Sequence, residues 1–227
     1  LFRSGALLLG MPYLLTQVPL MLVDVPAMFF LLLAVFTTLK ALERGGPGPL
    51  ALASVAVALA FWTKYSIWLF LSVLPVVVAV RFKDRPHPVL LRAGVLIMIS
   101  TVLIGVTLLP MSDVVGTQLI LLQSYQVPGL ARWEESPAST FLFQTHPFIA
   151  AAALVSVYAA FKKKDARCAI VLWLPALVMV LGINRIRYIL PVFPMLALMA
   201  AYGLREVRCG EIRKYIVLCI VASSVAL

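Results

Sequence analysis

Long apolar runs separated by short polar segments make up most of this chain. Several of these runs approach the ~20 residues that a helix needs to cross the hydrocarbon core of a membrane. The sequence therefore predicts membrane-spanning helices over residues 5–23, 27–39, 93–109, 147–161, 168–183 and 189–204, with a further run that begins at Tyr215. No internal repeat relates these runs to one another.

The run over residues 50–80 is predicted to make two short passes rather than one. Basic segments flank it on both sides, and basic loops prefer the cytoplasmic face, so a single pass would leave one of them outside. The polar interruption is Thr63-Lys64-Tyr65-Ser66, and Trp62, Tyr65 and Trp68 surround it as aromatic side chains at a membrane interface do. Both halves are short for a full span, which predicts a re-entrant or tilted hairpin that turns at Lys64.

Composition and charge agree with a membrane protein. The 227 residues are 63% hydrophobic and 12% charged, which excludes an ordinary soluble globular domain. Of the nineteen Lys and Arg residues, fifteen fall in alternate segments, including 81–92, that read as cytoplasmic. Because orientation explains the net charge of +10, and no basic aromatic-rich face occurs, nucleic acid is not a predicted partner.

The predicted fold class is all-α: a polytopic transmembrane helix bundle with the short hairpin and one longer extracytoplasmic loop. Residues 1–227 are expected to form a single transmembrane domain, as a fragment of a longer chain. The loop covers residues 111–146 and is expected to carry interfacial helices. The first of them is capped by Ser112, runs through residues 119–122 and is broken by Pro128-Gly129.

Four cations fall on the extracytoplasmic side, where the orientation rule disfavours them: Lys64, Arg132, Arg185 and Arg187. A bound anionic headgroup such as a lipid phosphate would explain them, and snorkelling of long basic side chains to the interface is the structural alternative. Residues 184–194, NRIRYILPVFP, concentrate this signal, because two arginines precede Tyr188 and two prolines then interrupt the following helix.

Two further polar residues on this side are candidates. Asp24 precedes Val25-Pro26, so it either caps the next helix or offers a carboxylate that holds a metal ion, orients a sugar hydroxyl or acts as a base. His146 precedes Pro147, with an interfacial loop position as the alternative to a functional one. The pair Glu134-Glu135 is read as a solvated loop face.

Motifs of soluble nucleotide or metal chemistry are absent. The sequence contains no Walker loop, HExxH, GxSxG or Cys/His metal spacing, and its three cysteines predict neither a disulfide nor a metal site. A divalent cation at Asp24 is the one cofactor that the sequence leaves open.

Three stretches resemble the membrane core of GT-C glycosyltransferases. They are VDVPAMFFLLLAVF at residues 23–36, ALAFWTKYSIWL at 58–69 and RIRYILPVFPMLALMAAYGL at 185–204. Within that superfamily, the chain is similar to the protein O-mannosyltransferase and lipid A aminoarabinose transferase group.

The resemblance implies a multi-pass plasma-membrane enzyme that moves a sugar from a polyprenyl-phosphate donor to a protein, lipid or glycan acceptor on the extracytoplasmic face. Asp24 then matches an acidic position of the family, Lys64 matches a lysine at the membrane edge, and Arg187-Tyr188 match an arginine–tyrosine pair near the lipid phosphate, with Arg185 beside them. The family's general base lies in an earlier outer loop, before the start of this chain, so the resemblance implies that the fragment alone is inactive.

Two other classes of protein remain open from the residues. A transporter or flippase for an anionic lipid or solute would also use Pro-interrupted helices and charges in membrane segments. A non-catalytic membrane scaffold would explain the hydrophobicity but leave the outer cations without a role.

Overall fold

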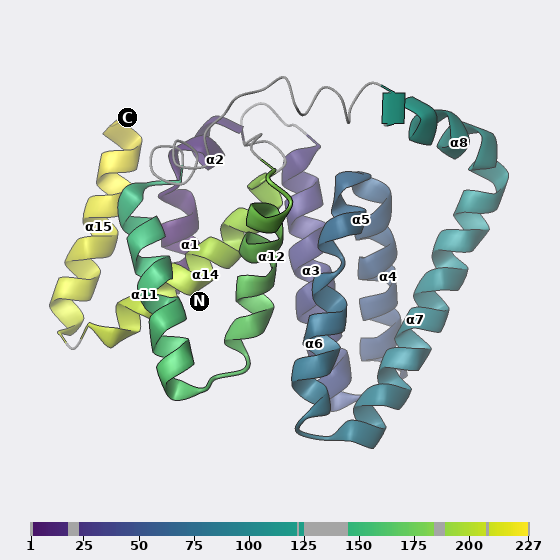
Figure 1. Ribbon diagram of the computed structural model, residues 1–227, viewed down its shortest axis with the longest axis horizontal. Helices are drawn as coiled ribbons and strands as arrows, with labels where there is room; N and C mark the ends of the chain where they lie inside the picture. Colours follow the sequence, from purple (N-terminus) through teal and green to yellow (C-terminus); the bar gives the residue numbers. More distant parts are fainter. Residues whose placement is uncertain are drawn as a thin grey trace. The chain divides into compact units, whose positions relative to one another are not determined.

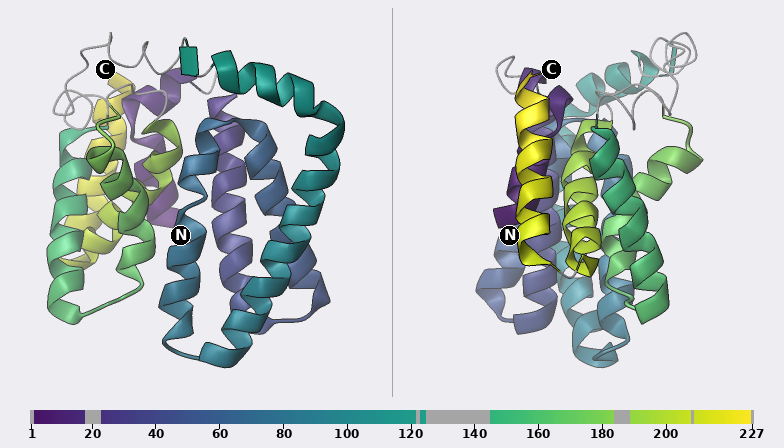
Figure 2. Two further views of the ribbon diagram at one scale, coloured as in Figure 1. Left: turned by 45° about the vertical axis from the view of Figure 1, so that its right-hand side comes forward. Right: turned by 90° about the vertical axis from the view of Figure 1, so that its left-hand side faces the viewer.

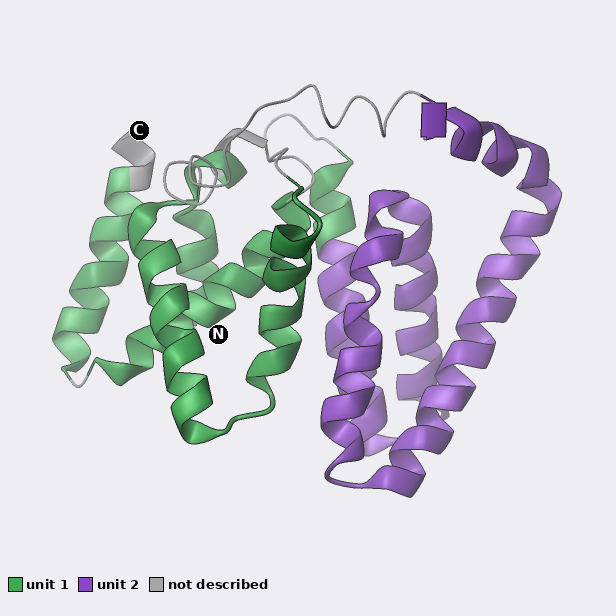
Figure 3. Ribbon diagram, in the orientation of Figure 1, with its two compact units in different colours: residues 1–28, 135–227 green, residues 29–134 purple. Residues whose placement is uncertain are grey.

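The computed structural model is all-helical over the residues that it describes, 2–17, 23–121, 123–124, 145–183, 189–207 and 209–226. No strand occurs in these ranges, which confirms the all-α class. The chain divides into two compact units, residues 1–28 with 135–227 (unit 1) and residues 29–134 (unit 2) (Figures 1 and 3). The single transmembrane domain expected from the sequence stays a prediction.

Unit 2 is built from helices that run up and down beside one another (Figure 1). They are α3 (Asp24–Arg44, which begins in unit 1), α4 (Pro47–Thr63), α5 (Ser66–Phe70), α6 (Val73–Phe82), α7 (Pro86–Leu108) and α8 (Ser112–Leu121), with the 3-10 turn η1 (Leu109–Met111) between the last two. Helix α7 packs against both α4 and α6. The turns that join α3 to α4 and α6 to α7 therefore lie at one end of the unit, and Lys64 lies at the other.

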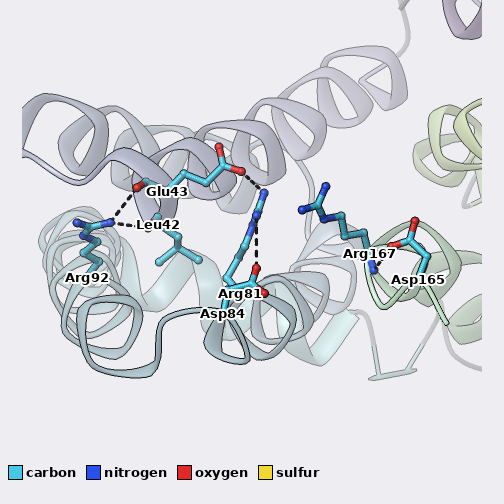
Figure 4. Close-up of polar contacts among 7 residues, drawn as sticks. All are labelled: Leu42, Glu43, Arg81, Asp84, Arg92, Asp165 and Arg167. Atoms are coloured by element: carbon cyan, nitrogen blue, oxygen red, sulfur yellow. Dashed lines mark hydrogen bonds and ion pairs between the residues drawn. The ribbon is translucent and has the colours of Figure 1, made fainter.

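Polar contacts fasten the end of unit 2 at which these two turns meet (Figure 4). The Arg92 guanidinium donates to the carbonyl oxygens of Leu42 at 2.6 Å and Glu43 at 3.1 Å, so a cation satisfies the last turn of α3. Arg81 pairs with the Glu43 carboxylate and lies 3.9 Å from that of Asp84. Gly45 follows with φ +68, a backbone conformation that favours glycine, and a Cβ there would come within 2.6 Å of the Arg92 guanidinium, which would have to move.

Unit 1 is organised around α14 (Phe193–Gly203) (Figure 2). Helices α1 (Phe2–Leu9), α11 (Pro147–Lys163) and α12 (Cys168–Val180) pack against it, and α15 (Gly210–Ala226) packs against α1. The remaining elements are α2 (Pro12–Gln17) and the 3-10 turns η4 (Leu190–Val192) and η5 (Leu204–Glu206). At Gly203 a Cβ would come within 2.0 Å of the Ala152 carbonyl oxygen, so α14 and α11 approach closely because glycine stands there.

The helix boundaries confirm some of the predicted elements. Helix α4 ends at Thr63 and α5 begins at Ser66, so the turn at Lys64 is where the sequence placed it. Helix α8 begins at Ser112, as expected for the first helix of the 111–146 segment. Pro191 lies in η4 and Pro194 in the first turn of α14, so both prolines stand where a helix begins and a missing N–H costs little.

Two predicted boundaries were wrong. Residues 5–23 were expected to form one pass, but α1 ends at Leu9 and α2 begins at Pro12, because the proline ring and its missing N–H cannot continue the preceding helix. Residues 81–92 were expected to be a loop, yet α6 extends to Phe82 and α7 already begins at Pro86, with proline favoured at a helix start.

Among the described residues, two helical stretches are long and apolar enough to cross a membrane, Asp24–Arg44 and the continuous stretch Pro86–Leu121. Within the same ranges, three further apolar helical stretches are shorter, Pro47–Thr63, Ser66–Phe82 and Cys168–Val180. These lengths agree with a membrane protein, and the number of passes stays a prediction.

Candidate functional site

Asp24 is the first residue of α3 and is almost completely buried, with 1% of its surface exposed. A carboxylate in the first turn is favoured there, because the helix dipole places partial positive charge at this end. Pro26 follows in the same turn, where its missing N–H breaks no intrahelical hydrogen bond. The helix-capping role of Asp24 stays a prediction. Burial of a carboxylate is costly and is typical of a group held for function or by specific partners.

Lys64 occupies the extended residue that ends α4, with φ −161 and ψ 134. An aromatic pair holds the turn beside it: the Phe61 and Trp68 rings stack at 4.6 Å with 8° between their planes, and Trp68 Nε1 donates to the Phe61 carbonyl at 2.8 Å. The backbone N–H of Ile67 donates to the Lys64 carbonyl at 3.0 Å. The lysine backbone is therefore fixed by packing and hydrogen bonds, and its half-buried side chain starts from a defined point.

Ser66 is a neighbour of Lys64 that the sequence reasoning missed as a site residue. Its Oγ is buried and makes no hydrogen bond within the described part of the chain. A buried hydroxyl without a partner costs about 1–3 kcal/mol, so this oxygen is suited to meet a polar group of a ligand. Its position two residues after Lys64, in the polar interruption, was the signal available in the sequence.

His146 is buried, with 4% exposed, although the sequence was compatible with an interfacial loop position. It precedes α11 with an unusual φ of +81, and its Nε2 lies 2.9 Å from the Ser223 Oγ of α15. Burial lowers the pKa of His146, so the neutral ring is favoured.

The second ring nitrogen of His146 gives this residue its chemical interest. Nδ1 is buried and makes no hydrogen bond to the described residues. Ser223 Oγ donates its proton to the Cys219 carbonyl oxygen, 2.8 Å away. The hydroxyl then accepts a hydrogen bond from His146, so the ring proton lies on Nε2 and Nδ1 presents a lone pair. The local geometry can therefore accept a hydroxyl proton at Nδ1.

The remaining predicted site residues cannot be placed by the structure. Arg132, Arg185, Arg187, Tyr188 and the Glu134-Glu135 pair all lie outside the described residues. Asp24 and His146 belong to unit 1, and Lys64 belongs to unit 2. Within the described ranges, no group of three or more His, Cys, Asp or Glu side chains gathers in a way that could hold a metal ion, and a divalent cation at Asp24 stays a prediction.

The helical architecture of the described residues and their long apolar helices are consistent with a membrane protein. Residues 2–104 match the family model described as dolichyl-phosphate-mannose-protein mannosyltransferase. No curated protein and no solved structure matches the chain in the other two comparisons. The match supports the resemblance to mannosyltransferases over residues 2–104, which contain the stretches 23–36 and 58–69 but not 185–204. The matched residues include Asp24 and Lys64 and exclude His146 and the 184–194 segment.

Proposed function

We propose that this chain is part of a multi-pass membrane glycosyltransferase that moves a sugar from a polyprenyl-phosphate donor to an acceptor on the extracytoplasmic face. The observation that carries the proposal is the family match over residues 2–104, which supports a membrane glycosyltransferase in general and contains both Asp24 and Lys64. Their surroundings add support, since one is a buried carboxylate and the other a lysine with a fixed backbone.

The proposed reaction is a displacement at the anomeric carbon of the donor. The acceptor oxygen forms a bond to that carbon, the bond from carbon to phosphate oxygen breaks, and the electron pair leaves with the polyprenyl phosphate. Negative charge grows on the phosphate as the bond breaks, so a cation beside it stabilises the transition state more than the ground state. We assign this role to Lys64, with Ser66 Oγ as a donor to a phosphate oxygen, and to the sequence-predicted Arg185, Arg187 and Tyr188.

Asp24 is proposed to align the acceptor or a sugar hydroxyl. A buried carboxylate accepts hydrogen bonds from hydroxyl groups in a fixed direction, which favours one orientation of the reacting oxygen. His146 Nδ1 is a second acceptor of this kind. The base that finally takes the acceptor proton is not assigned to a residue of this chain.

The test is sugar transfer by the full-length protein that contains this chain, reconstituted in vesicles and supplied with a panel of labelled polyprenyl-phosphate sugars. Asp24→Asn, Lys64→Met and Arg187→Ala are expected to lower transfer about 100-fold or more, the usual scale for positioned charges at a reacting centre. Asp113→Asn and Lys162→Met are matched controls, because both residues are exposed. We expect both variants to transfer sugar at the parent rate.

Full transfer in folded samples of all three variants would overturn the site assignment. A transporter or flippase would instead move the labelled lipid across the vesicle membrane in the absence of any acceptor. Movement without transfer would therefore replace the proposed function by the carrier alternative.

A further inference from the structure

Unit 2 contains an apolar groove of about 680 Å³, and none of the residues assigned to sugar transfer lines it. Its walls come from α3, α4, α6 and α7 and include Leu42, Val57, Leu74, Phe82, Ile97 and Ile104. The volume lies in the range of small-molecule sites, and the walls are almost entirely hydrocarbon. Since every wall residue belongs to unit 2, the groove is a property of this unit by itself.

Two hydroxyl groups in this groove lack partners. Thr38 Oγ1 and Ser100 Oγ are buried, line the groove and make no hydrogen bond to any described residue. Their neighbours behave differently: Thr37 Oγ1 donates to the Leu33 carbonyl at 2.6 Å, and Ser54 Oγ to that of Leu50 at 2.9 Å. Hydroxyls in helices normally bond to their own backbone in this way. The groove therefore offers two polar points to an occupant that is otherwise apolar.

The groove is elongated along α7. Its wall on this helix runs from Leu90 to Ile104, about 21 Å at 1.5 Å per residue. An extended apolar chain can lie along a wall of this length.

Two basic side chains lie in the turn between α6 and α7, which form two walls of the groove. Phe82 and Leu90 both line it, and Lys83 and Arg85 lie in the exposed turn between them. Neither side chain forms an ion pair with a described residue, because the nearby carboxylates Glu43 and Asp84 both lie against Arg81. Basic side chains beside an apolar cleft between membrane helices are suited to anionic lipid headgroups.

We propose that this groove binds an anionic phospholipid of the cytoplasmic leaflet. Its acyl chains would lie along α7, the phosphate would contact Lys83 and Arg85, and the hydroxyl of Thr38 would meet an ester carbonyl oxygen. The site differs from the proposed donor site, since the 82–90 turn and Lys64 lie at opposite ends of unit 2. Bound lipid would stabilise α7, whose large apolar side chains are mostly exposed.

Photo-crosslinking in vesicles tests the proposal. The protein is reconstituted in phosphatidylcholine vesicles with a small fraction of phosphatidylglycerol that carries a photoreactive group in its acyl chain, and labelled peptides are mapped. We expect label on the groove wall of α7 near Ile97. Gly94→Trp should abolish it, because Gly94 lines the groove and a Cβ there meets no atom within 4 Å, so the new side chain fills the groove without disturbing the helix.

Gly105→Trp is the matched control. Gly105 is on the same helix, has the same free space around its Cβ and does not line the groove, so the label should persist. Equal labelling of both variants would overturn the proposal. Loss of the label upon addition of unlabelled polyprenyl phosphate, but not of unlabelled phosphatidylglycerol, would also overturn it and assign the groove to the donor tail.

The headgroup contact has its own test. Lys83→Gln with Arg85→Gln should lower labelling by phosphatidylglycerol roughly tenfold and leave that by a phosphatidylcholine probe unchanged. Lys162→Gln with Arg167→Gln removes two exposed cations of unit 1 and should alter neither. An equal loss with both pairs would mean attraction to the membrane as a whole and would overturn the assigned headgroup site. These readouts do not depend on sugar transfer, so they stand or fall separately from the proposed function.

Discussion

Helices α14 of unit 1 and α7 of unit 2 are both strongly apolar, yet they are used in opposite ways. Eight of the eleven residues of α14 are buried, whereas α7 buries only Val89, Ala93, Leu96 and Ser100. Over the stretch Pro86–Leu121, 22% of the most apolar window is buried, against 50% for Asp24–Arg44. Apolar character alone therefore does not distinguish a helix in the interior of a membrane bundle from one that faces lipid.

The two helices differ in the size of the side chains on the faces concerned. In lipid, helices gain little from hiding apolar surface from each other, so close packing between small residues decides which of them associate. Helix α14 meets α11 where Gly203 faces Ala152 and Ser156. The exposed face of α7 carries large side chains such as Leu91, Ile97 and Met98, which favour contact with acyl chains. We infer that unit 1 owes its stability to close contacts between helices. Unit 2 combines a lipid-facing surface with the contacts of Arg81 and Arg92 at the end of α3, which we call the polar clamp.

Gly203→Ala is the most direct way to break this comparison. A Cβ at this position would lie 2.0 Å from the Ala152 carbonyl oxygen, and backbone cannot move aside as a flexible side chain can. We expect a loss of about 3 kcal/mol in the free energy of unfolding, measured by thermal or denaturant unfolding in detergent. Gly94→Ala and Gly105→Ala on α7 should be neutral or slightly stabilising, since no atom lies within 4 Å of either Cβ. Equal tolerance at all three positions would refute the distinction.

Arg92→Met tests the polar clamp of unit 2. The substitution keeps the aliphatic stem and removes the donors to the Leu42 and Glu43 carbonyl oxygens in the last turn of α3 (Figure 4). Hydrogen bonds from a charged donor contribute about 1.5–3 kcal/mol, so we expect a loss of about 2 kcal/mol. Lys162→Met, which removes an exposed cation, is the control. A loss no larger than that of the control would mean that packing alone holds the end of α3.

Much of the fold was readable from single polar residues inside apolar runs. Lys64 marked the turn of the hairpin, because the basic segments on both sides of residues 50–80 can lie on the cytoplasmic face only if the chain turns back between them. The break between α4 and α5 confirms this turn. The break between α1 and α2 was missed, although Pro12 was visible, because run length was given more weight than proline. The groove beside α7 could not be predicted, since it depends on which faces of four helices meet.

The sequence indicated which residues belong to the candidate site, but it did not indicate their burial or their hydrogen-bond partners. Asp24 was recognised from its position before Val25-Pro26, but its burial follows from tertiary packing. His146 looked like a loop residue because its partner Ser223 stands 77 positions away in the chain. Ser66 was overlooked because a serine next to a turn is common, and only its buried, unpaired oxygen makes it notable.

His146→Gln should produce a smaller, pH-dependent effect within unit 1. Burial lowers the pKa of His146 in the folded protein below the value of about 6.5 expected in the unfolded chain. The unfolded state therefore binds more protons as the pH falls below about 6.5, and the parent protein loses stability there, whereas above it the neutral ring contributes no such penalty. Glutamine reaches Ser223 without titrating, so the variant should lose less stability on acidification. Identical pH profiles of the unfolding temperature would mean that His146 does not titrate between the two states.

The smallest expected losses of stability come from breaking the ion pairs. We expect the larger loss for the pair whose basic side chain is more buried. In unit 2, Arg81 pairs with Glu43, and their side chains are 18% and 46% exposed, whereas the side chains of the Lys163–Glu206 pair in unit 1 are 52% and 37% exposed. The main difference is that Arg81 is much more buried than Lys163. Water and salt screen an exposed pair more effectively, so Glu43→Gln should cost about 1 kcal/mol and Glu206→Gln less. Unfolding measured at low and high salt checks this ranking, since the contribution of the exposed pair should shrink further as salt is added. A larger effect at Glu206 would show that its carboxylate holds the α11–η5 contact together, and unit 1 would then depend on polar clamps as much as unit 2 does.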